Sequence, residues 1–221
     1  GPATMSDHDN TAAGAAPVSF RTWISPEAHG RANFYALISR LFADAPDAPL
    51  LRAIAGSPPL ATDDDGMPLA LAWSRLIAAC TVVDVDAAAA EYETLFVGVG
   101  KAPLNLHASH HLTGFMMEQP LADVRTALAT LGFAGVGAQT MVEDHLSALC
   151  EVMRLLIVGG SGVEPAPLAV QRRFFEAHIA PWFDRCCAAI AESSLANFYR
   201  VVAQFTCNYL QIERDAFAIG E

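Results

Sequence analysis

The chain has 221 residues, a formal net charge of -11 at neutral pH and an apolar content of 53%. A chain of this size and composition can bury a substantial core and fits a single domain. Its only lysine is Lys101, and a nucleic-acid binder needs clustered cations to neutralise phosphates, so that class is excluded. The acidity keeps a hydrophobic chain soluble, and it also suits a basic partner.

The first residues differ in composition from the rest of the chain. Residues 1–5 are typical of a cloning scar that ends in an initiator methionine, and residues 6–17 are polar, rich in alanine and glycine, and aperiodic. We therefore expect residues 1–19 to form a disordered tail and residues 20–221 to form the folded domain. No apolar run reaches the roughly 18 residues that span a bilayer, and no signal peptide is recognisable, so we expect a soluble, cytoplasmic protein.

The cysteines show neither a disulfide framework nor a metal-binding pattern. Their number, five, is odd, no CxxC spacing occurs, and most fall on the apolar faces of predicted helices. We expect reduced core residues at Cys80, Cys150, Cys186, Cys187 and Cys207.

Apolar residues recur at three- and four-residue spacing through most of the chain, which predicts amphipathic helices. Pro26 and Glu27 open the first helix, Asp84 or Asp86 can cap the fourth, and Pro181 should kink or split a long one near the end. We expect helices at about residues 26–43, 49–55, 67–79, 86–96, 117–131, 143–158 and 168–191, and a last one that begins after Ser194. No strand-period segment or internal repeat competes, so the sequence predicts an all-α, single-domain helical bundle.

One long connection interrupts this helical pattern. The helical period disappears from Val97 to Gly114, and we expect a hinge-like loop over about residues 97–116. A loop of this length inside a compact domain is more often functional than idle. Domain exchange through it is a route to a homodimer.

Several histidines in and near this loop raise the alternative of a metal site. His107, His110 and His111 lie together in the loop, and the run from Glu143 to His145 could supply further ligands. Neither HExxH nor a paired ExxH pattern occurs, so histidines hydrogen-bonded in a polar loop are favoured over metal ligands. We expect no metal and no cofactor.

The pair Asp144 and His145 stands at the predicted start of a helix. Acidic residues in a first turn favour the positive end of the helix dipole and satisfy free backbone donors. An Asp–His pair can also orient an imidazole for acid–base work, but no Ser or Cys nucleophile occurs in a recognisable setting. We therefore expect no enzymatic activity.

A third feature is the apolar stripe of Tyr92, Leu95 and Phe96. Its helical spacing is typical of a core-facing surface, and equally of a groove in which aromatic side chains bind a peptide and flanking carboxylates hold basic residues. The residues alone do not decide between the two interpretations.

Several segments, taken in order, resemble the TorD/DmsD/NarJ family of redox-enzyme maturation chaperones over about residues 31–214. The segment 35–42 looks like the family's first helix, and 91–98 looks like its "Y..LF.G" helix end. Pro103 with Ser109, the run 144–146, and the segments 174–182 and 198–199 complete the resemblance. The ordered set is specific, although no single segment is.

The resemblance implies an all-helical cytoplasmic chaperone with a peptide-binding site. Such a protein binds the twin-arginine signal peptide, the apo form, or both, of a molybdenum-cofactor oxidoreductase, and it assists cofactor insertion and proofreading before export. Matching positions imply a peptide site at Tyr92, Phe96, Ser109, Asp144 and His145. One departure is that Met141 and Val142 stand where many members have Glu and Pro.

The same site suggests a specific hypothesis, in which Asp144 pairs with a client arginine and His145 hydrogen-bonds the peptide backbone. Two other classes of protein compete with the chaperone. One is a metalloenzyme that uses the clustered histidines, and the other is a structural subunit whose acidic face docks a permanent partner.

Overall fold

The computed structural model describes residues 24–133, 141–160 and 162–220, and in these ranges it is built of helices and contains no strand. The all-α prediction is therefore confirmed, while the predicted tail at residues 1–19 lies outside the described residues. The helices are α1 Pro26–Ala43, α2 Ala48–Ala55, α3 Met67–Val82, α4 Val85–Tyr92, α5 Ala108–Thr113, α6 Gln119–Leu131, α7 Leu146–Val158, α8 Leu168–His178, α9 Phe183–Glu192 and α10 Phe198–Ile219. A 3-10 turn at Asp64–Gly66 precedes α3, and a π-helical turn at Glu93–Val97 continues α4.

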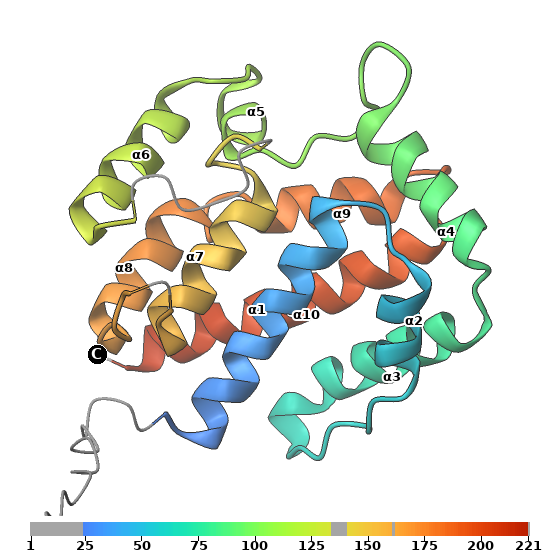
Figure 1. The fold of residues 1–221 in the computed structure, drawn as a ribbon, viewed down its shortest axis with the longest axis horizontal. Helices are drawn as coiled ribbons and strands as arrows, with labels where there is room; N and C mark the ends of the chain where they lie inside the picture. The colour runs from blue at the N-terminus through green and yellow to red at the C-terminus, as the bar shows by residue number, and fades with distance from the viewer. Residues whose placement is uncertain (1–23, 134–140, 161, 221) are drawn as a thin grey trace, which may run out of the picture.

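Helix α1 runs through the centre of the molecule and packs along α7, while α10 packs against α3 and α9 (Figure 1). Tyr35, Ile38 and Phe42 recur at three- and four-residue spacing on α1 and are fully buried. The centre of the fold is rich in aromatic side chains, and the largest fully buried ones include Trp182, Tyr35, Tyr199, Phe42, Phe133 and Phe175.

The helix starts follow the chemistry expected for N-caps. The side chain of Ser25 accepts a hydrogen bond from the Ala28 N–H at 3.1 Å and caps α1. Asp84, rather than Asp86, caps α4 by accepting from the Ala87 N–H at 2.9 Å. Of the two residues proposed from the sequence, Asp84 is therefore the N-cap of α4.

The predicted break at Pro181 is confirmed. Helix α8 ends at His178 and α9 begins at Phe183, so the long segment is two helices. Trp182 lies in the break, is fully buried, and donates its indole N–H to the His178 carbonyl at 2.7 Å.

Three expectations about the middle of the chain are corrected. The loop expected from Val97 to Gly114 is shorter, because α5 occupies residues 108–113. Met117, expected on the stripe of the next helix, precedes α6 and has a positive φ of 58°. Helix α7 begins at Leu146 rather than at Glu143.

Two further properties concern cysteines and membranes. All five cysteines are free; four are buried and Cys207 is half-buried. Among the described residues no single helix is both long and apolar enough to cross a membrane. Only the pair Asp64–Val82 and Val85–Val97, bent by 117°, meets that test on length and composition.

Candidate functional site

Tyr92 and Phe96 belong to a cluster of four aromatic rings, which also contains Phe42 of α1 and Tyr199 of α10. The Tyr92 ring centroid lies 5.2 Å from that of Phe96 and 5.7 Å from that of Tyr199. Phe96 in turn lies 5.1 Å from Tyr199 and 5.8 Å from Phe42. We call this set the aromatic cluster; such contacts stabilise the fold beyond simple burial.

The two tyrosine hydroxyls of the aromatic cluster bind the end of α1. Tyr92 donates to the Phe42 carbonyl at 3.0 Å, and Tyr199 donates to the Leu41 carbonyl at 2.7 Å. The last carbonyls of a helix have no partner within it, so these hydroxyls satisfy them. Tyr92 and Leu95 are buried, which favours the core interpretation for both, whereas Phe96 is half-buried.

Glu91, immediately before Tyr92, caps a helix that is distant in sequence. Its carboxylate accepts hydrogen bonds from the backbone N–H groups of Asn197 and Phe198 at 3.0 Å each and of Tyr199 at 2.6 Å. These N–H groups form the start of α10, where a negative charge is favoured. Glu91 therefore anchors α4 to α10 beside the aromatic cluster.

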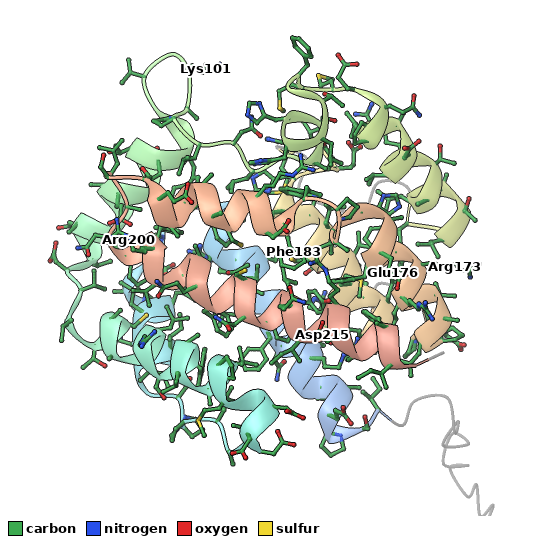
Figure 2. The ribbon with its side chains drawn as sticks, turned by 180° about the vertical axis from the view of Figure 1, so that it is seen from behind. Lys101, Arg173, Glu176, Phe183, Arg200 and Asp215 are labelled. Carbon is green, nitrogen blue, oxygen red and sulfur yellow. The ribbon has the colours of Figure 1, made fainter. Side chains whose placement is uncertain are left out.

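The π-helical turn ends at a glycine that the backbone requires. Gly98 donates its N–H to the Glu93 carbonyl at 2.7 Å and has a φ of 68°. A Cβ placed on Gly98 would lie 2.7 Å from the Lys101 carbonyl oxygen, so only glycine fits. The chain then forms a protruding loop with Lys101 on it (Figure 2), beside a pocket of about 430 Å³.

A second group of candidate residues lies where two chain segments meet just before α5 and α7. The Ala108 N–H donates to the Asp144 carbonyl at 3.0 Å, and the Leu146 N–H donates to the Leu106 carbonyl at 2.9 Å. These two bonds flank an antiparallel bridge between His107 and His145. We call the side chains gathered there the His–Asp junction: His107, Ser109, Asp144 and His145.

Asp144 is the buried acceptor of the His–Asp junction. Its Oδ2 accepts the Ser109 N–H at 2.8 Å and thereby caps α5, and its side chain is fully buried. No described residue hydrogen-bonds to Oδ1. The local interpretation, in which Asp144 occupies the first turn of its own helix, is wrong because the carboxylate caps a helix 35 residues earlier in the chain.

His145 is the N-cap of α7. Its Nδ1 accepts the Ser147 N–H at 3.0 Å, so the ring is neutral with its proton on Nε2. Burial, with a smaller contribution from His107, lowers the pKa of His145 to about 3. His145 is therefore a neutral imidazole across the physiological range of pH.

His107 packs edge-on against His145, with ring centroids 4.9 Å apart. Its ring Nδ1 lies 3.0 Å from the side-chain oxygen of Asn105, which also accepts the His107 backbone N–H at 2.8 Å. Burial lowers the pKa of His107, and the nearby Asp144 carboxylate opposes this shift. His107 thus interacts electrostatically with both the Asp144 carboxylate and the His145 ring.

The segment between α5 and α6 exposes apolar side chains beside the junction. Phe115 and Met117 are 69% and 63% exposed, and Met116 is 38% exposed. Ser109 connects this segment to the junction, because its Oγ accepts the Glu118 N–H at 3.2 Å. Exposed methionine and phenylalanine side chains suit adaptable contacts with apolar partners. We call residues 115–117 the apolar loop.

The clustered histidines do not converge as metal ligands. Within the described residues no group of three or more His, Cys, Asp or Glu side chains is placed to hold a metal ion. His111 instead stacks on Trp182 with centroids 5.4 Å apart, and its Nε2 lies 2.6 Å from the Asn105 carbonyl.

A groove of about 1160 Å³ lies elsewhere, between α1, α8 and α10. Arg31 and Glu213 line it and form a bidentate ion pair, in which Arg31 Nη2 lies 2.9 Å from Glu213 Oε1. None of the five candidate peptide-site residues lines this groove.

The structure therefore divides the five candidates into two groups. Tyr92 and Phe96 belong to the aromatic cluster, and Ser109, Asp144 and His145 belong to the His–Asp junction. No hydrogen bond or ring contact between described residues joins the groups directly. The chain from residue 98 to residue 106 connects them.

Three contributions of the site were not assigned from the sequence. Glu91 begins the "Y..LF.G" segment, but nothing local indicates that it caps a helix 106 residues later. His107 is considered from the sequence as a loop residue or a metal ligand, whereas its ring contact with His145 depends on the antiparallel bridge. The run Phe-Met-Met after Gly114 was a visible signal for the apolar loop.

Together these features define an all-helical protein with buried polar and aromatic groups at its candidate site. Residues 62–188 match the family described as nitrate reductase delta subunit, which is more than half of the chain, so the protein belongs to that family. The family consists of molybdoenzyme maturation chaperones, and the resemblance seen in the sequence is confirmed. No curated protein sequence matches the chain.

Proposed function

We propose that this protein is a cytoplasmic chaperone for one molybdenum-cofactor oxidoreductase. It binds the twin-arginine signal peptide, the apo-protein, or both, and it assists cofactor insertion and proofreading before export. The observation that carries this proposal is the match of residues 62–188 to a molybdoenzyme chaperone family. The proposed action is binding and release, without catalysis by the chaperone itself.

The chemistry of the surface supports a basic, apolar client. The chain has a net charge of -11, which attracts a peptide with arginines at its head. The apolar loop next to the His–Asp junction offers exposed area for the apolar body of such a peptide. Arginine and carboxylate pair in a bidentate geometry that fixes the register of a bound peptide.

The five candidate peptide-site residues differ in burial, and we propose different roles for them on that basis. Ser109 and Asp144 are fully buried, so we propose that they position α5 and the apolar loop. His145 and Phe96 are only partly buried and remain candidates for direct contact. Tyr92 would hold Phe96 in place. Pairing of Asp144 with a client arginine stays a prediction, and it requires the junction to open.

Calorimetric titration tests the proposal directly. The full chain is titrated with a twin-arginine signal peptide of a molybdoenzyme encoded beside its gene, and with a twin-lysine version of the same peptide. We expect the arginine peptide to bind about tenfold more tightly, or roughly 1.4 kcal/mol, because lysine lacks the bidentate geometry. Failure to bind any neighbouring candidate peptide or apo-enzyme would contradict the proposal.

Assembly is a separate part of the proposal. Residues 98–106 connect the aromatic cluster to the His–Asp junction, and exchange of the helices on either side would give a domain-swapped homodimer. Size-exclusion chromatography with light scattering measures the mass over a range of concentrations. A single monomeric mass at every concentration would exclude the dimer and leave the chaperone proposal standing.

A further inference from the structure

Helices α9 and α10 lie side by side (Figure 2). Two arginines of α10 define how the two helices are aligned. Arg214 donates from Nη2 to the Ala180 carbonyl at 2.6 Å, just before α9 begins. Arg200 donates to the carbonyls of Ala191 and Ser193 at 3.0 Å each, where α9 ends. The helices are therefore antiparallel, and contacts at both ends of α9 fix how they are aligned.

This register places one cysteine of each helix at the middle of the contact. Cys207 lies seven residues after Arg200 and seven before Arg214. Cys187 lies seven residues after Ala180 and four before Ala191. Seven helical residues rise by about 10.5 Å, so Cys207 lies about two turns from Arg214 on α10. Cys187 lies four residues, just over one turn, after α9 begins at Phe183, so both cysteines lie near the middle of the contact.

The neighbouring cysteine on α9 shows which way Cys187 faces. Cys186 directs its sulfur to the Asn105 carbonyl, 3.8 Å away, on the segment that leads to the His–Asp junction. Successive residues of a helix point about 100° apart, so Cys187 faces a different neighbour. That neighbour is α10, where hydrogen bonding between the Cys187 and Cys207 thiols shifts the pKa of both.

The two thiols differ in burial and in acidity. Cys187 is 3% exposed, whereas Cys207 is half-buried and is the one cysteine that reaches the surface. The hydrogen bond from Cys187 lowers the pKa of Cys207 to about 7, against the opposing effect of burial. The same bond, together with burial, raises the pKa of Cys187. A half-buried thiol with a lowered pKa thus lies beside a buried thiol with a raised one.

We propose that Cys187 and Cys207 form a dithiol that peroxide oxidises to a disulfide joining α9 to α10. The Cys207 thiolate attacks one oxygen of hydrogen peroxide, the O–O bond breaks, and hydroxide leaves. The sulfur of Cys187 then attacks the resulting sulfenic acid; an S–S bond forms, the S–O bond breaks, and the departing hydroxide leaves as water with the thiol proton. Two thiols and one peroxide give one disulfide and two water molecules.

Intact-mass analysis of the reduced full chain tests this modification. After treatment with hydrogen peroxide and denaturation, we expect a loss of two hydrogens and three alkylatable thiols in place of five. Both changes should be absent in Cys207→Ala and in Cys187→Ala. Cys186→Ala is the matched control, because it changes the adjacent buried thiol, whose sulfur contacts the Asn105 carbonyl, and it should still form the disulfide.

A second measurement uses the unmodified sequence and does not depend on a variant that folds. Iodoacetamide should alkylate Cys207 before the other cysteines, with a rate that reaches half its maximum near pH 7. Oxidation of Cys207 that stops at sulfenic or sulfinic acid, without a bond to Cys187, would overturn the proposal. So would loss of the disulfide in Cys186→Ala, or alkylation of Cys207 at the pH of an ordinary thiol.

Discussion

The aromatic cluster and the His–Asp junction both come from segments that stand out in the sequence, yet they are held by different physics. In the aromatic cluster, packed rings and two hydroxyls close the end of α1. In the His–Asp junction, an antiparallel bridge and two side-chain caps fix the starts of α5 and α7. One region depends on burial, and the other depends on oriented acceptors and neutral imidazoles.

The difference shows that candidate residues taken from one family resemblance can have different structural roles. The fold by itself accounts for Tyr92, because its ring is buried in the aromatic cluster and its hydroxyl donates to the Phe42 carbonyl. The junction also satisfies backbone groups, but it does so beside the exposed apolar loop. Substitutions in the two regions should therefore differ in the size of their effect and in their dependence on pH.

The largest effect is expected for Tyr92→Ala. The substitution removes a buried ring and leaves a cavity among Phe42, Phe96 and Tyr199, so the free energy of unfolding should fall by about 3 to 5 kcal/mol. Urea unfolding followed by circular dichroism measures it. Thr94→Ala, an exposed change in the same π-helical turn, is the control and should change it by less than about 0.5 kcal/mol. Equal losses would mean that the cluster is not the source of stability.

A smaller loss is expected for Asp144→Ala. It removes a charged acceptor from the Ser109 N–H at the start of α5, at a cost of about 1.5 to 3 kcal/mol in the free energy of unfolding. Glu143→Ala is the matched control, because its carboxylate pairs with Arg125 at the surface and such pairs contribute about 0 to 1 kcal/mol. A larger loss for Glu143→Ala would contradict the junction as described.

Tyr92→Phe separates the hydroxyl from the ring. It keeps the aromatic packing and leaves the Phe42 carbonyl without its donor, so about 0.5 to 1.5 kcal/mol should be lost. The same urea titration applies, now with the ring intact. A loss as large as that of Tyr92→Ala would show that the hydrogen bond, rather than burial, dominates the aromatic cluster.

The smallest effect at pH 7, and the most specific, is expected for His145→Asn. Asparagine is a good N-cap for the Ser147 N–H but does not titrate, so stability at pH 7 should change by less than about 0.5 kcal/mol. The pKa of His145 is about 3 in the folded protein against roughly 6.5 when unfolded, so between these values the unfolded state binds the extra proton. Its contribution is complete above about pH 6.5 and is lost as the pH falls toward 3.

Unfolding of both proteins at pH 7 and pH 5 checks this expectation. The native sequence should lose more stability than His145→Asn over that interval. Some loss should persist in the variant, because burial also lowers the pKa values of His107, His111 and His178. Identical losses in the two proteins would show that His145 is not buried as a neutral base.

Much of the fold follows from local sequence rules. Three- and four-residue spacing located the long helices, Asp84 was one of the two proposed caps, and the break at Pro181 follows from its missing N–H. These features depend on residues within one or two helical turns. Local rules are sufficient for them because the relevant contacts are local.

The errors arise where contacts are distant in sequence. Helix α5 has six residues, too few to show a period, and its cap comes from Asp144, 35 residues later. Met117 fits the spacing of Leu121 on α6, but its positive φ ends that periodicity before the helix begins. The sequence pattern could identify the residues of the His–Asp junction as candidates. Only the antiparallel bridge shows which of them lie together.

Lys101, on the protruding loop, also gives the protein a single side-chain attachment point for amine-directed reagents. Because this residue has the only side-chain amine in the sequence, amine-directed cross-linkers and labels that attach to a side chain can do so only in the loop that follows the π-helical turn. A cross-link from Lys101 to a client would orient that client relative to the aromatic cluster without any mutation. A fluorophore at the same position would report from one known place on the surface.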